Sequence, residues 1–208
     1  MIRTNGLSHA YDPTNVLNFR DWEINFNDQW LLLGSSGSGK TTLIHILSGL
    51  LKPKNGDVFV DDTNLYRLTQ NKLDRFRGQR IGLVFQRPHL IKSLSIKDNL
   101  KIAQSFAGLS VNSNRIVEVL ETLGILSKVN NYPHQLSHGQ LQRVSIARAV
   151  INKPALIVAD EPTSSLDDEN TRLVLDLLIT QSVLNNSALI ISTHDKRVKD
   201  MFDKQYLL

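Results

Sequence analysis

Short apolar runs alternate with amphipathic stretches along most of the chain. Strand-like apolar runs lie near 23–26, 30–33, 58–60, 81–85, 155–159 and 188–192. Residues 40–50 and 168–183 have the period and length of helices. Alternating strands and helices predict an α/β core with a parallel sheet and crossover helices.

Residues 95–148 have a different period. Apolar side chains recur three and four positions apart, as in the stripe formed by Ile116, Val119, Leu120 and Leu123. This spacing is typical of amphipathic helices. We therefore expect a helical lobe inserted into the α/β core, which makes the core discontinuous in sequence.

The composition is that of one ordinary globular unit. The 208 residues are 41% hydrophobic and 21% charged, which suits one substantial core rather than several domains. No apolar run approaches the roughly 18 residues needed to span a bilayer, and residues 1–12 lack the pattern of a secretory signal. The absence of cysteine excludes disulfides. We expect a cytoplasmic location.

Positive charge gathers in the segment 67–101, called the basic segment below. The net charge of the chain is only +4, yet this segment holds nine Lys or Arg residues against Asp74 and Asp98. Such a segment can be a solvated face, a nucleic-acid contact or a surface close to anionic lipid headgroups. The sequence leaves all three open.

A phosphate loop follows the strand predicted at 30–33. Its pattern is glycine, four residues, glycine, lysine and a hydroxyl residue, carried by Gly34, Ser35, Ser36, Gly37, Ser38, Gly39, Lys40 and Thr41. Backbone amides at a helix start cradle phosphate oxygens, while Lys40 would reach the terminal phosphates and Thr41 would ligate Mg²⁺. The preceding strand and the following helix disfavour a plain Gly/Ser turn.

Two carboxylates, Asp160 and Glu161, end the apolar run before them. In open α/β folds ligands bind at the carboxyl edge of the sheet, where these acids would lie. Asp160 would assist Mg²⁺, and Glu161 would orient or deprotonate an attacking water. Paired acids can also be plain turn residues, but the phosphate loop upstream favours chemistry. Together the two motifs indicate a phosphate-loop nucleotidase.

Residues 136–149 narrow this class. The signature segment, Leu136-Ser137-His138-Gly139-Gln140, and the helical run after it resemble the signature motif of ABC (ATP-binding cassette) proteins. Ser137 also suits the N-cap of a helix. Four further markers follow the family's order: Tyr11 is similar to its adenine-stacking aromatic, Gln86 to its Q-loop, Ser164-Ser165-Leu166-Asp167 to its D-loop, and His194 to its switch histidine. Each alone has an ordinary structural interpretation, but together they cover nearly the whole chain.

The resemblance implies the fold class and its division. We expect a phosphate-loop α/β core with a mixed or parallel sheet, an N-terminal antiparallel β subdomain and an inserted α-helical subdomain. The whole chain, 1–208, would be a single ABC ATPase domain. Residues 1–86 and 150–208 would form its nucleotide-binding core, and about 87–149 its helical signature subdomain.

The resemblance also implies an ATPase site shared by two cassettes packed head to tail around two ATP molecules with Mg²⁺. One chain would bind nucleotide through Tyr11, Thr42 and the phosphate loop. The other chain would bind the same nucleotide through Ser137, Gly139 and Gln140. Catalytic roles fall to Lys40, Gln86, Glu161 and His194, and Mg²⁺ contacts to Thr41, Gln86 and Asp160.

The same resemblance implies partners and a place of work. The chain would be the ATP-hydrolysing subunit of an ABC transporter or mechanotransmission complex, in a homomeric pair. It would drive an integral membrane subunit on a separate chain, at the inner face of the cell membrane, with no specific nucleic acid. Residues 77–86, with Leu90, Leu94 and Asn99, resemble the lipoprotein-releasing, macrolide-efflux and cell-division branch.

The alternative is a soluble non-transport ABC ATPase that acts on nucleic acid or serves as a nucleotide-dependent dimer switch. Chromosome-associated members carry long coiled coils, and no sustained heptads occur here. Translation-associated members carry two cassettes, and this chain has one. Because Glu161 and His194 fill both hydrolytic positions, the sequence argues against a pure switch.

Two departures from the family pattern stand out. His138 occupies a position where glycine is usual, which lowers the flexibility of the signature segment and adds a titratable group to it. The chain also ends at Leu208, soon after His194, where cassettes usually continue into a further strand and helix. We therefore expect no regulatory extension there.

Overall fold

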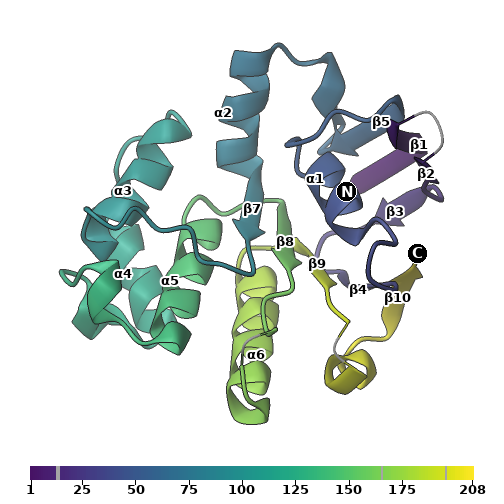
Figure 1. Cartoon of the computed structure of the whole chain (residues 1–208). Coiled ribbons are helices and arrows are strands. Elements are labelled where there is room, and N and C mark those ends of the chain that lie inside the picture. The colour runs from purple at the N-terminus through teal and green to yellow at the C-terminus, as the bar shows by residue number, and fades with distance from the viewer. Residues whose placement is uncertain (13–14, 165, 195) are drawn as a thin grey trace.

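The computed structural model describes residues 1–12, 15–164, 166–194 and 196–208. Within these residues the chain forms two five-stranded sheets, with helices between them and along one side (Figure 1). This α/β arrangement confirms the predicted fold class.

The first sheet is antiparallel and is built around the long strand β1 (Ile2–Asp12). β1 pairs with β2 (Asn15–Asn18), β3 (Trp22–Ile24) and β5 (Asn55–Val60), and β6 (Thr63–Asn64) extends the sheet beyond β5. It is the antiparallel N-terminal layer implied by the family resemblance. β1 and β2 were not predicted, and the strand predicted at 23–26 is two residues shorter at its end.

The second sheet is parallel, in the order β10 (Lys204–Leu207), β4 (Gln29–Leu33), β9 (Ala188–Ser192), β8 (Leu156–Asp160) and β7 (Ile81–Val84). Because neighbouring strands run the same way, the carboxyl ends of β4, β9 and β8 meet at one edge. The motifs that follow these three strands are thereby brought together. β10 lies beyond His194, where no further strand was expected.

Six α-helices complete the described fold: α1 (Lys40–Leu47), α2 (Gln70–Arg80), α3 (Ile96–Phe106), α4 (Ser113–Thr122), α5 (His138–Val150) and α6 (Asp168–Leu184). Short 3-10 turns lie at Leu65–Arg67, Leu126–Lys128, Pro133–Gln135 and Lys196–Met201. In Figure 1, α3, α4 and α5 gather to one side, as expected for the helical insertion. None of the helices described is long and apolar enough to cross a membrane.

Two hydrophobic cores hold the layers together. One joins α1 to the antiparallel sheet and to one face of the parallel sheet, through residues such as Ile44, Val58 and Ile190. The other core packs the four helices α3, α4, α5 and α6 against the opposite face of the parallel sheet, through residues such as Leu100, Val144 and Ile157. All six of these side chains are at most 1% exposed. The parallel sheet is thus covered on both faces, which agrees with its nearly continuous apolar strands.

Candidate functional site

The phosphate loop connects the end of β4 to the start of α1. Gly37 and Gly39 have φ values of 80° and 102°, in the left-handed region that favours glycine. Gly39 is the N-cap of α1, and no side chain caps this end of the helix. The Ser38 amide donates to the Ser35 carbonyl at 3.2 Å, closing the turn. The loop therefore presents helix-start amides suited to an anion.

Lys40 lies over this loop. Its Nζ donates to the carbonyls of Gly34 at 2.8 Å and Ser35 at 3.1 Å. A cavity of about 380 Å³ opens beside it, within the size range of ligand sites. Its lining consists of Tyr11, Asn15, Leu17, Ser36, Gly37, Gly39, Lys40, Thr41, Thr42 and Glu161.

Asp160, the last residue of β8, contacts the phosphate loop. The Thr41 hydroxyl donates to Asp160 Oδ2 at 3.2 Å, and the Ser192 hydroxyl donates to Asp160 Oδ1 at 2.5 Å. Since Ser192 ends the neighbouring strand β9, two strands and the loop converge on one carboxylate. Thr41 and Asp160 are brought together as predicted from the sequence.

Glu161 follows directly and points into the cavity. Its φ of 49° is unusual for a residue other than glycine, and its amide donates to the Ser192 carbonyl at 3.0 Å. Glu161 Oε1 lies 2.8 Å from Nδ1 of His194. Its other oxygen, Oε2, is buried and has no hydrogen-bond partner among the described residues.

Tyr11 borders the same cavity from the antiparallel sheet. Its hydroxyl shares a hydrogen bond of 2.9 Å with the Thr42 hydroxyl. Its ring packs edge-on against His9 but remains 62% exposed. An exposed aromatic face beside a phosphate-binding loop suits a stacked base. Figure 1 shows the antiparallel sheet and α1 on the same side of the molecule.

The signature segment lies elsewhere. Ser137 caps α5 in a capping box: the Gln140 amide donates to Ser137 Oγ at 3.4 Å, and the Ser137 amide donates to Gln140 Oε1 at 3.0 Å. Ser137 and His138 are exposed, and Gly139 is half-buried. Neither these residues nor Gln140 line the cavity beside Lys40. One chain therefore does not bring its own signature segment to its own phosphate loop.

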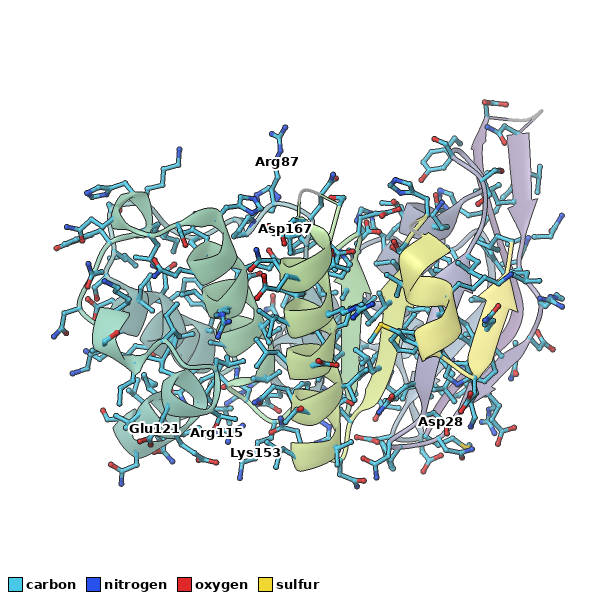
Figure 2. All side chains as sticks on the ribbon, turned by 90° about the horizontal axis from the view of Figure 1, so that it is seen from below. Asp28, Arg87, Arg115, Glu121, Lys153 and Asp167 are labelled. Atoms are coloured by element: carbon cyan, nitrogen blue, oxygen red, sulfur yellow. The ribbon has the colours of Figure 1, made fainter. Side chains whose placement is uncertain are left out.

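Gln86 also lies outside that cavity. It follows β7 and is exposed, at the same sheet edge as Glu161 because β7 pairs with β8. Of the residues similar to a D-loop, Ser165 lies outside the described residues. Asp167 is the N-cap of α6, and hydrogen bonds from the backbone and side chain of Asn170 lower the pKa of its carboxyl. Figure 2 shows Asp167 at the start of α6 and Arg87 projecting outward.

Sequence reasoning missed three residues of the site. Ser192 had a usable signal, because it ends a strand that was predicted to its last residue. Asn15 and Leu17 had none, since their strand β2 was not predicted and reaches the cavity only through its pairing with β1.

Comparisons with known proteins agree with this site. A family model described as ABC transporter matches residues 17–164. The lipoprotein-releasing system ATP-binding protein LolD of Buchnera aphidicola subsp. Schizaphis graminum is 39% identical over 189 residues, which cover 89% of this chain and 82% of that protein. LolD 1 of Chlorobium luteolum is 34% identical over 216 residues, which cover 98% of this chain and 92% of that protein.

Solved structures give the same assignment. The ATP-binding cassette MJ0796, in a dimeric post-hydrolysis state bound to ADP and Pi, superposes with a TM-score of 0.87. It is 29% identical, and the match covers all of this chain and 94% of that one. The predicted likeness to the lipoprotein-releasing branch is confirmed by the LolD relatives. The chain belongs to the ABC transporter family, as one of its ATP-binding, ATP-hydrolysing cassettes.

Proposed function

We propose that two copies of this chain close around two ATP molecules and that the cycle of closing and opening drives a membrane subunit on a separate chain. The observation that carries this proposal is the division of the site. The phosphate loop and Glu161 line one cavity, and Asp160 and His194 are hydrogen-bonded to Thr41 and Glu161 of that lining, while the signature segment neither lines the cavity nor has a hydrogen bond to these residues among those described. A second chain would supply the missing part.

Each side chain at the cavity has a role in this proposal. Lys40 and the loop amides hold the β and γ phosphates, and Tyr11 stacks on the base. Glu161 accepts a proton from the attacking water, while His194 holds its Oε1 and contacts the terminal phosphate. Positioning and charge stabilisation of this kind dominate phosphoryl transfer. Gln86 would join the site when the cassette closes.

The oxygen atoms near the loop fit Mg²⁺. A hydroxyl and a carboxylate oxygen, from Thr41 and Asp160, lie 3.2 Å apart at the mouth of the phosphate loop. Mg²⁺ prefers such oxygen ligands and usually keeps several waters beside substrate phosphates. Bound with ATP, the ion would neutralise charge on the phosphates. Ser192 would keep Asp160 oriented toward it.

Closure would bring Ser137, Gly139 and Gln140 of one chain onto the terminal phosphate held by the other. The cassette MJ0796 is dimeric in its post-hydrolysis state, which supports the same pairing here. We also propose the division of the chain into a nucleotide-binding core, 1–86 and 150–208, and a helical part, about 87–149. Closure would then move α5 with the helical part.

A second cavity, of about 580 Å³, suits the membrane subunit and is called the partner groove. It lies between α2, β7, α3 and α5, and its lining includes Arg77, Leu83, Phe85, Phe106 and Arg148. Phe106 is 80% exposed. Much of the lining belongs to the basic segment, close in sequence to Gln86. A groove here would link nucleotide state to a partner, at the cytoplasmic face of the membrane.

The names of the relatives suggest the kind of work. LolD proteins are ATP-binding proteins of lipoprotein-releasing systems. We propose that this chain likewise powers a membrane subunit that transports or releases a substrate on the far side of the membrane.

Glu161→Gln tests the pairing. The amide keeps the size of glutamate but is a far poorer base, so bound ATP should persist and hold two chains together. By mass action, a ligand that binds only the closed pair shifts the equilibrium toward it. Size-exclusion chromatography with light scattering should show a dimer with MgATP and a monomer with MgADP.

Ser137→Arg in the same background is the control. A bulky cation at the start of α5 should prevent closure while each phosphate loop still binds ATP. If the double variant forms dimers as well as Glu161→Gln alone, Ser137 does not face nucleotide across the interface. A monomeric Glu161→Gln with MgATP at high protein concentration would count against the pairing itself.

A further inference from the structure

A buried glutamine joins the signature helix to the backbone beside Glu161. Gln142, on α5, is 1% exposed. Its Nε2 donates to the carbonyl oxygen of Pro162 at 3.1 Å, in a buried hydrogen bond. Pro162 follows Glu161 directly. A single side chain therefore spans from the helix that begins at the signature segment to the peptide next to the proposed base.

Among the described residues, few hydrogen bonds join the segment after β8 to the rest of the fold. The Glu161 amide donates to the Ser192 carbonyl at 3.0 Å, and the Ser164 amide reaches the Glu161 carbonyl at 3.4 Å. Proline has no N–H to donate. The Gln142 amide is thus the contact through which another helix holds this segment at Pro162. Glu161 itself has a left-handed φ of 49°, a conformation that persists only where its surroundings hold it.

Packing alone does not explain a glutamine at this position. Its other amide atom, Oε1, is buried without a hydrogen-bond partner among the described residues. Burying an unpaired polar atom costs free energy that an apolar side chain of the same length would avoid. The amide is therefore present for the bond that its Nε2 makes.

The other end of this connection is the nucleotide contact proposed for the second chain. Ser137 caps the helix that carries Gln142, and the capping box with Gln140 fixes the first turn. A packed helix moves as a unit, so a shift of Ser137 toward the other chain's ATP also shifts Gln142. That movement reaches the Pro162 carbonyl and the peptide after Glu161.

We infer that Gln142 is a positioning residue for hydrolysis: it aligns Glu161 of its own chain when Ser137 engages the nucleotide held by the other chain. This inference rests on the proposed function, because it uses the pairing of two chains and the role of Glu161 as base. It adds a physical link by which the two ATP sites of a dimer sense each other.

Gln142→Met tests the inference, because methionine keeps the length and removes the donor. The turnover number kcat should fall about tenfold, since small displacements of a catalytic group have effects of this order or larger. KM for ATP should change less than about twofold, because Gln142 does not line the ATP cavity. Gln181→Met is the matched control: Gln181 is 2% exposed but lies near the far end of α6, and its kcat should equal that of the wild type.

A merely structural role would lower the melting temperature in both variants and leave kcat alone. If Gln142→Met melts below the assay temperature, Gln142→Leu is measured in its place. A folded variant of either kind with wild-type kcat overturns the inference.

The second readout is a double-variant cycle with Glu161→Gln, followed by single-turnover hydrolysis of labelled ATP over hours. If Gln142 acts through Glu161, adding Gln142→Met to Glu161→Gln should cause no further loss. A further tenfold loss would show that it acts elsewhere and would overturn the inference. Glu161→Gln alone distinguishes a failure of the proposed function from a failure of this inference. A wild-type hydrolysis rate in Glu161→Gln would refute the role of Glu161 as base. A lost rate in Glu161→Gln together with a wild-type rate in Gln142→Met would refute only the role of Gln142.

Discussion

At the scale of single residues, the site depends on side chains that hold one another in place. Asp160 is held from two sides by the Thr41 and Ser192 hydroxyls, and Glu161 is held by His194. Among the described residues no carboxylate lies within ion-pair distance of Lys40; its ammonium group contacts two loop carbonyls instead. Carbonyl oxygens accept hydrogen bonds from the ammonium group without pairing it with an opposite charge, which leaves its charge for phosphate.

Lys40→Ala should therefore remove most nucleotide binding. Among the described residues that line the cavity, Lys40 is the one lysine or arginine, so a chain with alanine at this position lacks the cation for the β and γ phosphates. We expect steady-state turnover to fall by about a hundredfold or more, as for loss of a key stabiliser of transition-state charge. Titration with a fluorescent ATP analogue and a phosphate-release assay measure both effects. Wild-type turnover in Lys40→Ala would refute the assignment of the phosphate loop.

The sequence predicted these residues because each motif has a fixed spacing next to a recognisable strand. Thr41 and Asp160, far apart in sequence, were both expected to contact Mg²⁺, and the two side chains do lie together. The role of Gln142 was not predictable in this way. Its contact with Pro162 depends on how α5 packs against the segment after β8, and nothing in the local sequence specifies that packing.

At the scale of elements, the parallel sheet was predictable and the antiparallel one largely was not. β8 and β9 are buried apolar runs that stand out in the sequence. β1 has an irregular register, with a shift between Asn5 and Ser8 where it pairs with β5, so its apolar positions do not alternate regularly. α2 buries only Leu73 and has no apolar stripe. β10 is a short edge strand whose buried residue is Tyr206.

The start of α3 allows a prediction about pH. Ser95 caps this helix, and its hydroxyl donates to Asp98 Oδ2 at 2.6 Å. This bond, and then one from Lys101, lower the pKa of the Asp98 carboxyl. Because this pKa is lower in the folded chain, the ionised carboxylate stabilises the fold at pH values above its pKa in the unfolded chain, which is about 3.9. This stabilisation is lost as the pH falls through the pKa that the carboxyl has in the folded chain.

Asp98→Asn should therefore lower the melting temperature at pH 7 by about 1–2 °C, the size expected for a partly exposed helix-start charge in a domain of this length. The difference from the wild type should shrink as the pH falls below 4. Calorimetry across this range tests it, with Glu121→Gln on α4, labelled in Figure 2, as an exposed control. If the melting temperatures of the wild type and Asp98→Asn differed by the same amount at every pH, the charge of Asp98 would not contribute to stability.

At the scale of the whole molecule, two cavities lie on different parts of the fold. The ATP cavity lies between the antiparallel sheet, α1 and the ends of β4 and β8, while the partner groove lies between α2, β7, α3 and α5. α5 connects them. It carries Ser137 at its start, and near its end Arg148 donates to the carbonyls of His89 and Pro88 at 2.6 and 2.8 Å. The loop after β7 is thereby fastened to the helix that would bind the second nucleotide.

This arrangement gives the basic segment a testable role. Arg87 and Lys92 are exposed on the loop between β7 and α3, and Figure 2 shows Arg87 pointing away from the body of the molecule. Reversing both charges, with Arg87→Glu and Lys92→Glu, should release the chain from a membrane partner. In cells that produce this double variant, the share of the protein recovered with washed membranes should be severalfold smaller than for the wild type. The melting temperature should be unchanged.

The control reverses two exposed lysines outside the basic segment, Lys52→Glu and Lys153→Glu. It matches the change in net charge, so a general loss of attraction to anionic lipid would affect both double variants alike. If the Arg87 and Lys92 double variant is released from membranes and the control double variant is not, the loop carries a specific docking surface. A fluorescent DNA duplex, titrated at two salt concentrations, tests the remaining interpretation of the basic segment. Tight, salt-sensitive DNA binding that disappears with Arg87 and Lys92, while membrane recovery stays the same, would favour a nucleic-acid partner over a membrane subunit.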